Sequence, residues 1–258
     1  MRTNQELNYL AIKLRKQFNE DEYSKIDIFS LCEKIDGLSI VLYPLGEHIS
    51  GICIKNKSTK VIAINSSMSK GRQRFSLAHE LYHLYVDNTQ GTIISKINLD
   101  NSNYIEKEAN TFASYLLMPY NALRQFIDNE ENTKEIELIL KIEHEFEISH
   151  QATLVRLLMD GIITKKEYDK YSKIKINEVS WFNDYPIDLY NPTKEPLNKR
   201  TYGHYIKQVN ELKNKNMISN GKYEELLLDA FRDDLVFSSN KGTIINDWYL
   251  FLWYRLFI

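Results

Sequence analysis

The chain has 258 residues, of which 43% are hydrophobic and 26% are charged, with 33 Lys and Arg residues against 35 Asp and Glu residues. This composition excludes a disordered chain and a collagen-like fibre, and the length allows one large domain or two smaller ones. Because the formal net charge is only −2, the chain has no overall field that would attract it to nucleic acid or to anionic lipid.

No feature of the sequence predicts export or membrane insertion. Residues 1–18 mix charged and apolar side chains and lack the apolar core of a secretory signal peptide. The longest apolar tract, residues 248–258, is well short of the roughly 20 residues that cross a bilayer, so we expect it to be core or an oligomer contact. The only cysteines, Cys32 and Cys53, form no CxxC pair, and we therefore expect a cytoplasmic protein without a membrane partner.

The first quarter of the chain predicts two helices and a small sheet. Apolar residues recur at helical spacing over residues 4–18 and 27–35, and Gly37 follows the second helix. The period then changes, and three short runs rich in β-branched residues follow: residues 38–45, 49–55 and 60–65. We expect these runs to form a three-stranded antiparallel sheet.

Two longer helices are predicted next. Residues 67–88 contain no proline and no glycine after Gly71, and their apolar residues recur at helical spacing. A second apolar stripe runs over residues 103–118 and is stopped by Pro119. The intervening residues 89–102 are predicted to be a loop.

Residues 133–171 have the outline of a helix-turn-helix segment, with a capping box formed by Thr164 and Glu167. Acidic side chains outnumber basic ones there, which argues against direct DNA binding and favours packing or protein docking. The proline-bearing residues 183–200 predict a connection to two packed C-terminal helices. The fold class is therefore expected to be α+β and mostly helical.

The motif that carries chemistry is His79-Glu80-Leu81-Tyr82-His83, in the middle of the predicted helix 67–88. Residues i and i+4 of a helix project from the same face, so His79 and His83 can share one small cation. Zn²⁺ suits neutral histidine nitrogens and accepts three protein ligands with water in the fourth position. Glu80 lies about 100° round the helix from His79, which makes it the candidate general base.

A catalytic zinc site needs a third protein ligand. The acidic candidates downstream are Asp87, Asp100, Glu106 and Glu108. Asp87 is one turn past His83, where its short side chain would have to fold back. Glu106 and Glu108 both fall at the edge of the apolar stripe of the next helix, so the periodicity leaves the choice between them open.

Two segments, residues 74–83 and residues 108–119, closely resemble the motifs of the ImmA/IrrE family of zinc metallopeptidases in order and spacing. The resemblance extends over about residues 4–168. It implies that His79, His83 and Glu108 bind Zn²⁺ and that Glu80 is the catalytic base, which leaves Glu106 as a residue behind the ligands or in solvent.

The resemblance also implies a domain organisation. A zincin-like metallopeptidase domain would occupy residues 1–130 and contain the small sheet. The helix-turn-helix-like segment would occupy residues 131–175, and a C-terminal extension whose role the resemblance does not address would occupy residues 176–258.

The family resemblance implies a bacterial, often phage-borne or mobile-element, endopeptidase that cuts a helix-turn-helix repressor and so derepresses mobile-element or stress-response genes. The expected partner is thus a protein substrate, and the expected cofactor is Zn²⁺. A non-proteolytic zinc protein that works by binding a regulatory partner is the alternative.

Several residues around the motif carry open expectations. Many family members have glycine where this chain has Tyr82, and we expect Tyr82 to pack against the following helix. Asn110 is a candidate hydrogen-bond partner of His79. The candidate donors to the reacting carbonyl oxygen are not ranked by the sequence: His48, Tyr82, Tyr85 and His150.

Overall fold

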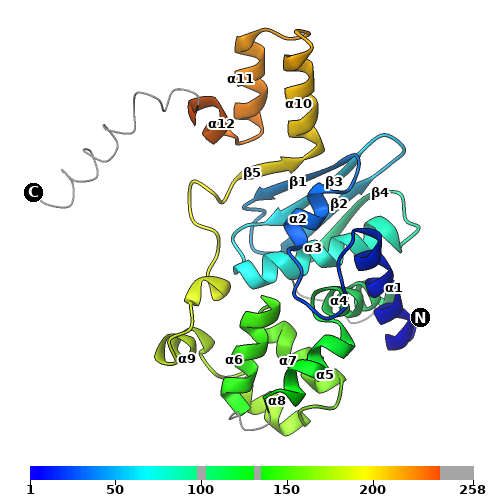
Figure 1. Ribbon diagram of the computed structural model, residues 1–258, viewed down its shortest axis with the longest axis vertical. Coiled ribbons are helices and arrows are strands. Elements are labelled where there is room, and N and C mark those ends of the chain that lie inside the picture. Colours follow the sequence, from blue (N-terminus) through cyan, green and yellow to red (C-terminus); the bar gives the residue numbers. More distant parts are fainter. Residues whose placement is uncertain (98–102, 131–134, 239–258) are drawn as a thin grey trace, which may run out of the picture.

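A computed structural model describes residues 1–97, 103–130 and 135–238 of the chain (Figure 1). A sheet lies in the middle of the molecule. In Figure 1, helices from residues 104–171 lie below it, and a helical hairpin of residues 204–229 lies above it. No helix in these ranges is long and apolar enough to cross a membrane. The C-terminal tract 248–258, predicted to be core or an oligomer contact, lies outside the described residues.

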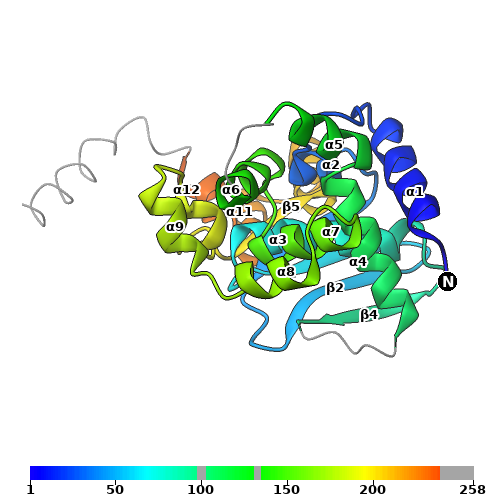
Figure 2. The same ribbon diagram turned by 90° about the horizontal axis from the view of Figure 1, so that it is seen from below.

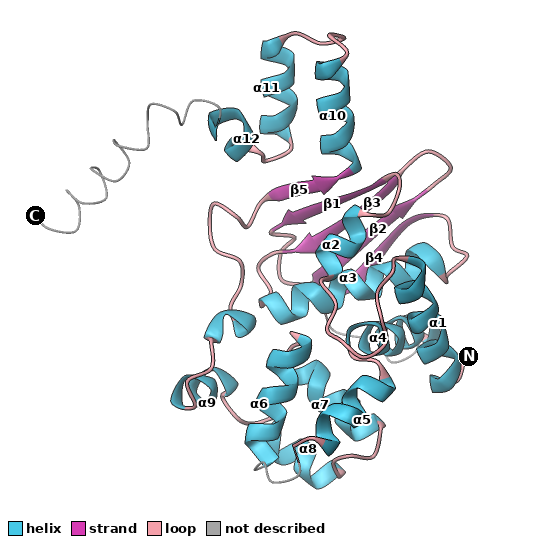
Figure 3. Cartoon of the chain, in the orientation of Figure 1, coloured by secondary structure: helices cyan, strands magenta, loops and turns pink. Residues whose placement is uncertain are grey.

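The sheet has five strands in the order β4-β2-β3-β1-β5 (Figure 3). Their bounds are β1 Leu38–Tyr43, β2 Ile49–Lys55, β3 Lys60–Asn65, β4 Gly91–Lys96 and β5 Arg200–Gly203. β1 and β3 pair in parallel, and the other neighbouring strands are antiparallel. Figure 2 shows β4 at the edge of the sheet.

The three runs predicted to be strands are confirmed as β1, β2 and β3. The sheet has five strands rather than three, and the β1–β3 pairing is parallel rather than antiparallel. β4 lies inside residues 89–102, which were predicted to be a loop. β5 begins at the end of the predicted connection 183–200 and pairs with β1, with Ile40 opposite Tyr202. Such a pairing between distant segments leaves no local pattern, which is why the sequence did not reveal it.

The helices of the first half agree with the predictions to within a few residues. They are α1 Asn4–Gln17, α2 Ile28–Glu33, α3 Lys70–Tyr85 and α4 Tyr104–Leu117. Side chains cap their N-termini: Ser69 accepts a hydrogen bond from the Arg72 amide in α3, and Asn103 accepts one from the Ile105 amide in α4. These caps fix where the two helices that carry the HExxH motif and its acidic candidates begin.

Four helices follow α4. They are α5 Tyr120–Asp128, α6 Glu135–Phe146, α7 His150–Met159 and α8 Lys165–Tyr171. The predicted capping box of Thr164 and Glu167 is confirmed at the start of α8. Helix α5 was not predicted. Pro119 follows the end of α4 as expected, but it is also the N-cap residue of α5.

The C-terminal part contains α9 Ile176–Phe182, a short 3-10 helix η1 Ile187–Tyr190, α10 His204–Asn214, α11 Asn220–Asp229 and α12 Asp233–Ser238. The two predicted packed helices are confirmed as α10 and α11, which lie at the top of Figure 1. They have a small core of their own that includes Val209 and Leu227.

One continuous core joins the rest of the molecule. Buried apolar residues from α1 through the sheet and α3 to α8 form a single cluster, which includes Leu77, Phe112 and Leu154. Helices α6, α7 and α8 thus pack directly on the part of the chain that carries the HExxH motif. The division at residues 130 and 175 stays a prediction.

A buried arginine ties α1 to α4. Arg15 is fully buried, and its guanidinium donates hydrogen bonds to the carbonyl oxygens of Leu116 (2.6 Å), Asp21 (2.6 Å) and Ser24. The Leu116 carbonyl is one of those at the C-terminal end of α4 that have no partner within the helix. Arg15 therefore satisfies a helix end that would otherwise be buried without a donor.

We expect Arg15→Leu to lower the free energy of unfolding by about 3 kcal/mol, because it leaves buried carbonyl oxygens without donors. Urea unfolding followed by circular dichroism measures the change. Lys13→Leu is the matched control, since Lys13 is an exposed residue of the same helix, and it should change stability by less than about 0.5 kcal/mol. Equal unfolding midpoints for the two variants would contradict the role given to Arg15.

Candidate metal centre

The two histidines of the HExxH motif face each other across one turn of α3. His79 is 5% exposed and His83 is fully buried, and their Nε2 atoms are 3.2 Å apart. The helix packs between the sheet and α4, with β2 on one side. The spacing of i and i+4 thus produces the shared position that the sequence predicts.

Glu106, in the first turn of α4, completes the cluster. Its carboxylate oxygens lie 3.2 Å from Nε2 of His79 and 3.5 Å from Nε2 of His83. The three ligand atoms all lie within 4.8 Å of one another, so His79, His83 and Glu106 could hold a metal ion.

Glu108 does not lie in this cluster, which corrects the expectation taken from the family resemblance. Its buried carboxylate accepts hydrogen bonds from the Tyr82 hydroxyl (2.5 Å), from the Arg2 amide (2.6 Å) and from the Arg2 guanidinium (2.6 Å). Residues i and i+2 of a helix are about 200° apart, so Glu106 and Glu108 point to opposite sides of α4. The roles expected for the two glutamates are therefore exchanged in the structure.

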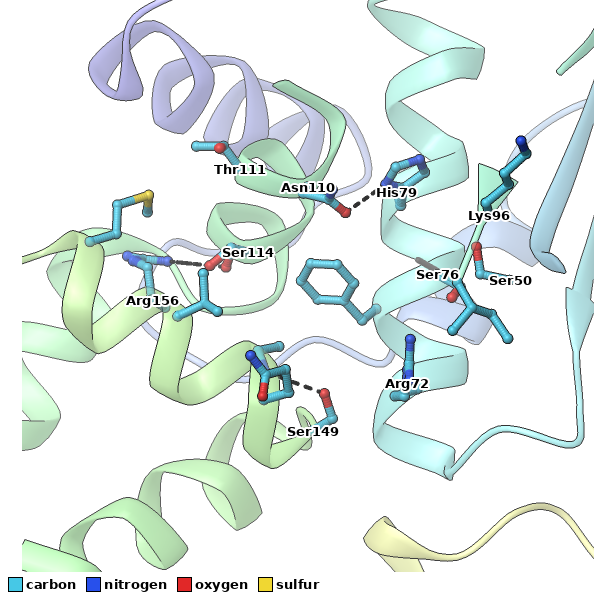
Figure 4. Close-up of a pocket in the computed structure, with 16 residues that line it drawn as sticks. Ser50, Arg72, Ser76, His79, Lys96, Asn110, Thr111, Ser114, Ser149 and Arg156 are labelled. Carbon is cyan, nitrogen blue, oxygen red and sulfur yellow. Dashed lines mark hydrogen bonds between the residues drawn. The ribbon is translucent and has the colours of Figure 1, made fainter. Parts of the chain in front are cut away.

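Each histidine is oriented by a hydrogen bond through its other ring nitrogen. Nδ1 of His79 lies 2.9 Å from Oδ1 of Asn110, as Figure 4 shows, and Nδ1 of His83 lies 3.1 Å from Oδ2 of Asp87. Because both oxygens accept, each Nδ1 donates to its partner, and this leaves Nε2 of each ring facing the carboxylate of Glu106. The predicted hydrogen bond of Asn110 is confirmed. Asp87, an open candidate for the third ligand, orients His83 instead.

The Nε2 atoms of the two histidines and the carboxylate oxygens of Glu106 lie close together in a largely buried position. Burial alone would raise the pKa of Glu106, but hydrogen bonds to His79 and His83 outweigh it and lower that pKa to about 2. Burial alone would lower the pKa of His83, but its hydrogen bond to Glu106 and the charge of Glu80 outweigh it and raise the pKa. A cation at the common point would balance these charges, and two histidines with one glutamate are a ligand set that Zn²⁺ takes in peptidases.

The Glu80 carboxylate is fully buried beside the histidines. Neither of its oxygens makes a well-formed hydrogen bond to a described residue, and burial raises its pKa, although the nearby Ser95 hydroxyl and the two histidines act in the opposite direction. Gly51 of β2 makes the space: a Cβ atom at that position would lie 2.5 Å from Oε1 of Glu80. The role of Gly51 was not predicted. The sequence offered one sign of it, since a glycine inside a strand often marks the close approach of another group.

A lysine on the same strand holds the end of α3. The Lys55 ammonium donates hydrogen bonds to the carbonyl oxygens of His83 (2.8 Å) and Asp87 (2.7 Å). A cation at a helix C-terminus is favourable because the free carbonyl groups point there. Strand β2 thus both accommodates Glu80 and fixes the helical turn that bears His83.

The four candidate donors to a reacting carbonyl oxygen do not line the cavity beside His79. The Tyr82 hydroxyl is held by Glu108, and its ring packs edge-on against Phe112 of α4 at 5.6 Å, which confirms the predicted packing role. His150 is hydrogen-bonded to Glu143 and to the Tyr171 carbonyl. His48 and Tyr85 are exposed.

Comparison with known proteins identifies the segment that carries the site. Residues 37–158 match the family model described as Peptidase M78, IrrE N-terminal-like domain. These residues are therefore similar to an M78 peptidase domain. This range contains both histidines, Glu80 and Glu106, so the family match supports a peptidase.

Two individual proteins are also similar to the chain. The chain is 28% identical over 123 residues to Uncharacterized immunity region protein 2 of Bacillus phage phi105, which covers 47% of this chain and 77% of that protein. A solved structure, a Mycobacterium tuberculosis transcriptional regulator, is similar with a TM-score of 0.42 and 18% identity over 60% of this chain. The chain spans only 46% of the length of that structure.

Because Glu106 faces the histidines and Glu108 does not, we predict that replacing each of them has a different effect on metal binding. We expect Glu106→Ala to lower the affinity for Zn²⁺ by about 100-fold or more, because it removes a ligand atom, and Glu108→Ala to lower it by less than about tenfold. Both variants remove one negative charge, so each is the control for the other. Competition with a chromophoric chelator gives the affinities, and a larger loss in Glu108→Ala would contradict the cluster described here.

The raised pKa of His83 predicts that the metal affinity of the protein falls as the pH is lowered. A metal ion binds the neutral imidazole, so protons compete once the pH drops below the His83 pKa, whereas Glu106 stays ionised. We expect the Zn²⁺ dissociation constant to rise about tenfold per pH unit below the His83 pKa, measured from about pH 8 to about pH 5.5. A pH-independent dissociation constant would contradict this coupling.

Proposed function

We propose that the chain is a zinc-dependent endopeptidase that cleaves a peptide bond in a regulatory protein. The observation that carries the proposal is the convergence of the buried His79 and His83 with the half-buried Glu106, beside the buried carboxylate of Glu80. A ligand set with one free carboxylate next to it provides both a place for the metal and a proton acceptor. The M78 family match supports the same reaction class.

When bound, Zn²⁺ would lower the pKa of a water molecule and polarise the carbonyl group of the bond to be cleaved. Glu80 then accepts the proton of the attacking water at a carboxylate oxygen and donates it to the nitrogen of the leaving amine. Asn110 and Asp87 keep the imidazole rings in place during the reaction.

The proposed substrate is a helix-turn-helix repressor in the bacterial cytoplasm, whose cleavage would derepress mobile-element or stress-response genes. The similarity to a phage immunity region protein supports this regulatory setting. Direct DNA binding by the chain itself is not part of the proposal.

The proposal is tested with wild type and Glu80→Gln, both loaded with zinc and incubated with the repressor-like protein encoded nearest the gene. We expect wild type to make a single cut and Glu80→Gln to retain zinc but cut about 10²–10⁴-fold more slowly, because it lacks the proton acceptor. Intact-mass analysis identifies the cut, and metal analysis confirms the zinc content.

Two outcomes would count against the endopeptidase. Equal cleavage by wild type and zinc-loaded Glu80→Gln would show that Glu80 is not the base. Stable binding of the repressor without any cut by zinc-loaded wild type would favour the alternative, a non-proteolytic zinc protein that binds a regulatory partner.

A further inference from the structure

A cavity of about 380 Å³ lies directly beside His79, between α3, α4, α7 and the end of β4 (Figure 4). This volume is within the range of about 300–1,000 Å³ that is typical of ligand pockets. Its apolar lining comes from three parts of the fold: Phe75 of α3, Ile97 after β4, and Ala152, Val155 and Met159 of α7. Val155 is a large apolar residue that is 48% exposed, so the wall is open to an incoming apolar group.

Helix α7 is the second helix of the helix-turn-helix-like segment, which is the helix that reads DNA in proteins with that motif. Here one face of α7, with Gln151, Ala152, Val155 and Met159, lines the cavity, and the opposite face, with Leu154, is buried in the core. The face that is only partly buried therefore lines the cavity beside His79, with Met159 also in contact with the core. In this chain, α7 forms a wall of the candidate active site.

The position of α7 is fixed by a close backbone approach. At Gly71, in the first turn of α3, a Cβ atom would lie 2.7 Å from the amide nitrogen of Ser149, the residue that caps α7. Any larger residue at position 71 would push the turn before α7 away from α3. The absence of a side chain at Gly71 thus sets how far α7 stands from the helix that bears His79.

The charged side chains that line the cavity are all basic. Arg72 and Lys96 line it with exposed side chains, and neither forms an ion pair with a described residue. Figure 4 shows Lys96 and Arg156 on opposite sides of it. Arg156 is fully buried and its Nε forms an ion pair with Asp160 (2.8 Å), so its charge is already balanced; only its Nη2 atom lacks a hydrogen-bond partner within the described part of the chain. No described carboxylate lines the cavity, so it suits an apolar group that lies next to a negative one.

We propose that this cavity binds an apolar side chain of the substrate next to the bond that is cleaved, and that Arg72 and Lys96 favour a substrate carboxylate beside it. This inference rests on the proposed peptidase function and names the substrate class: polypeptide segments with an apolar residue adjacent to an acidic one. A basic substrate residue at the same place is disfavoured by repulsion from the cationic rim. Val155 and Met159 set the size of the side chain that fits.

The test uses binding of small metal-chelating probes, so it does not depend on finding the substrate. Four peptide hydroxamates carry either a methyl or an isobutyl side chain next to the chelating group, followed by either Asp or Lys. Calorimetry gives their affinities for the zinc-loaded full-length protein. We expect isobutyl to bind about tenfold more tightly than methyl, because additional apolar surface is buried, and Asp about threefold more tightly than Lys.

Two variants locate these preferences in the cavity. Val155→Trp should reduce the ratio between isobutyl and methyl affinities to below about twofold, because the indole fills the space. Arg72→Glu should reverse the preference for Asp over Lys. The matched controls are Ile187→Trp and Lys57→Glu, at residues that are exposed and do not line the cavity, and both ratios should stay as in wild type.

The outcomes separate this inference from the proposed function. Zinc-dependent binding of all four hydroxamates without a side-chain preference, or a preference that Val155→Trp leaves intact, would overturn the assignment of the cavity and leave the metal centre standing. Failure of every hydroxamate to bind the zinc-loaded protein would contradict the proposed metallopeptidase and the cavity assignment together. Bound zinc and unchanged thermal unfolding show that each variant is folded.

Discussion

The packing of α3 between the sheet and α4 is the constraint on which the rest of the site depends. A carboxylate without a well-formed hydrogen bond is costly to bury, and it can be tolerated here only because β2 approaches α3 at a glycine. The same strand supplies the Lys55 ammonium to the last carbonyl groups of α3. One strand therefore determines both the room for Glu80 and the position of the turn that carries His83.

From the other side, α4 completes the site with two glutamates that serve different purposes. Glu106 faces the histidines, and Glu108 joins Tyr82 and the partly exposed Arg2 in a hydrogen-bonded group that ties α3, α4 and the start of the chain together. Tyr82 occupies the side of α3 that is turned away from the cavity, so its bulk does not narrow the space beside His79. The metal cluster and this hydrogen-bonded group thus lie on opposite sides of α4, whereas on α3 they are neighbours, since the Tyr82 ring packs edge-on against the His83 ring with a centroid distance of 5.7 Å.

Much of this could be predicted from the sequence, because helical periodicity and the HExxH spacing are local signals. They placed α3 and α4 to within a few residues and brought His79, Glu80 and His83 together. The strands β4 and β5 were missed because their existence depends on pairing with distant partners. Periodicity could not decide between Glu106 and Glu108, because both border the apolar stripe, and the choice of Glu108 came from the family resemblance alone. Only the packing of α4 against α3 shows which of the two faces the histidines.

Because of the close contact at Gly71, the position of α7 and the identity of its side chains are determined separately. Because backbone atoms of α3 and of the turn before α7 meet there, the width of the cavity is a property of the main chain. The side chains of α7 that face the cavity can therefore change in size or charge without moving the histidines. Relatives built on this frame could diverge in the segments they recognise while the chemistry stays the same, and the size of the side chain that the cavity accepts could be changed from α7 alone.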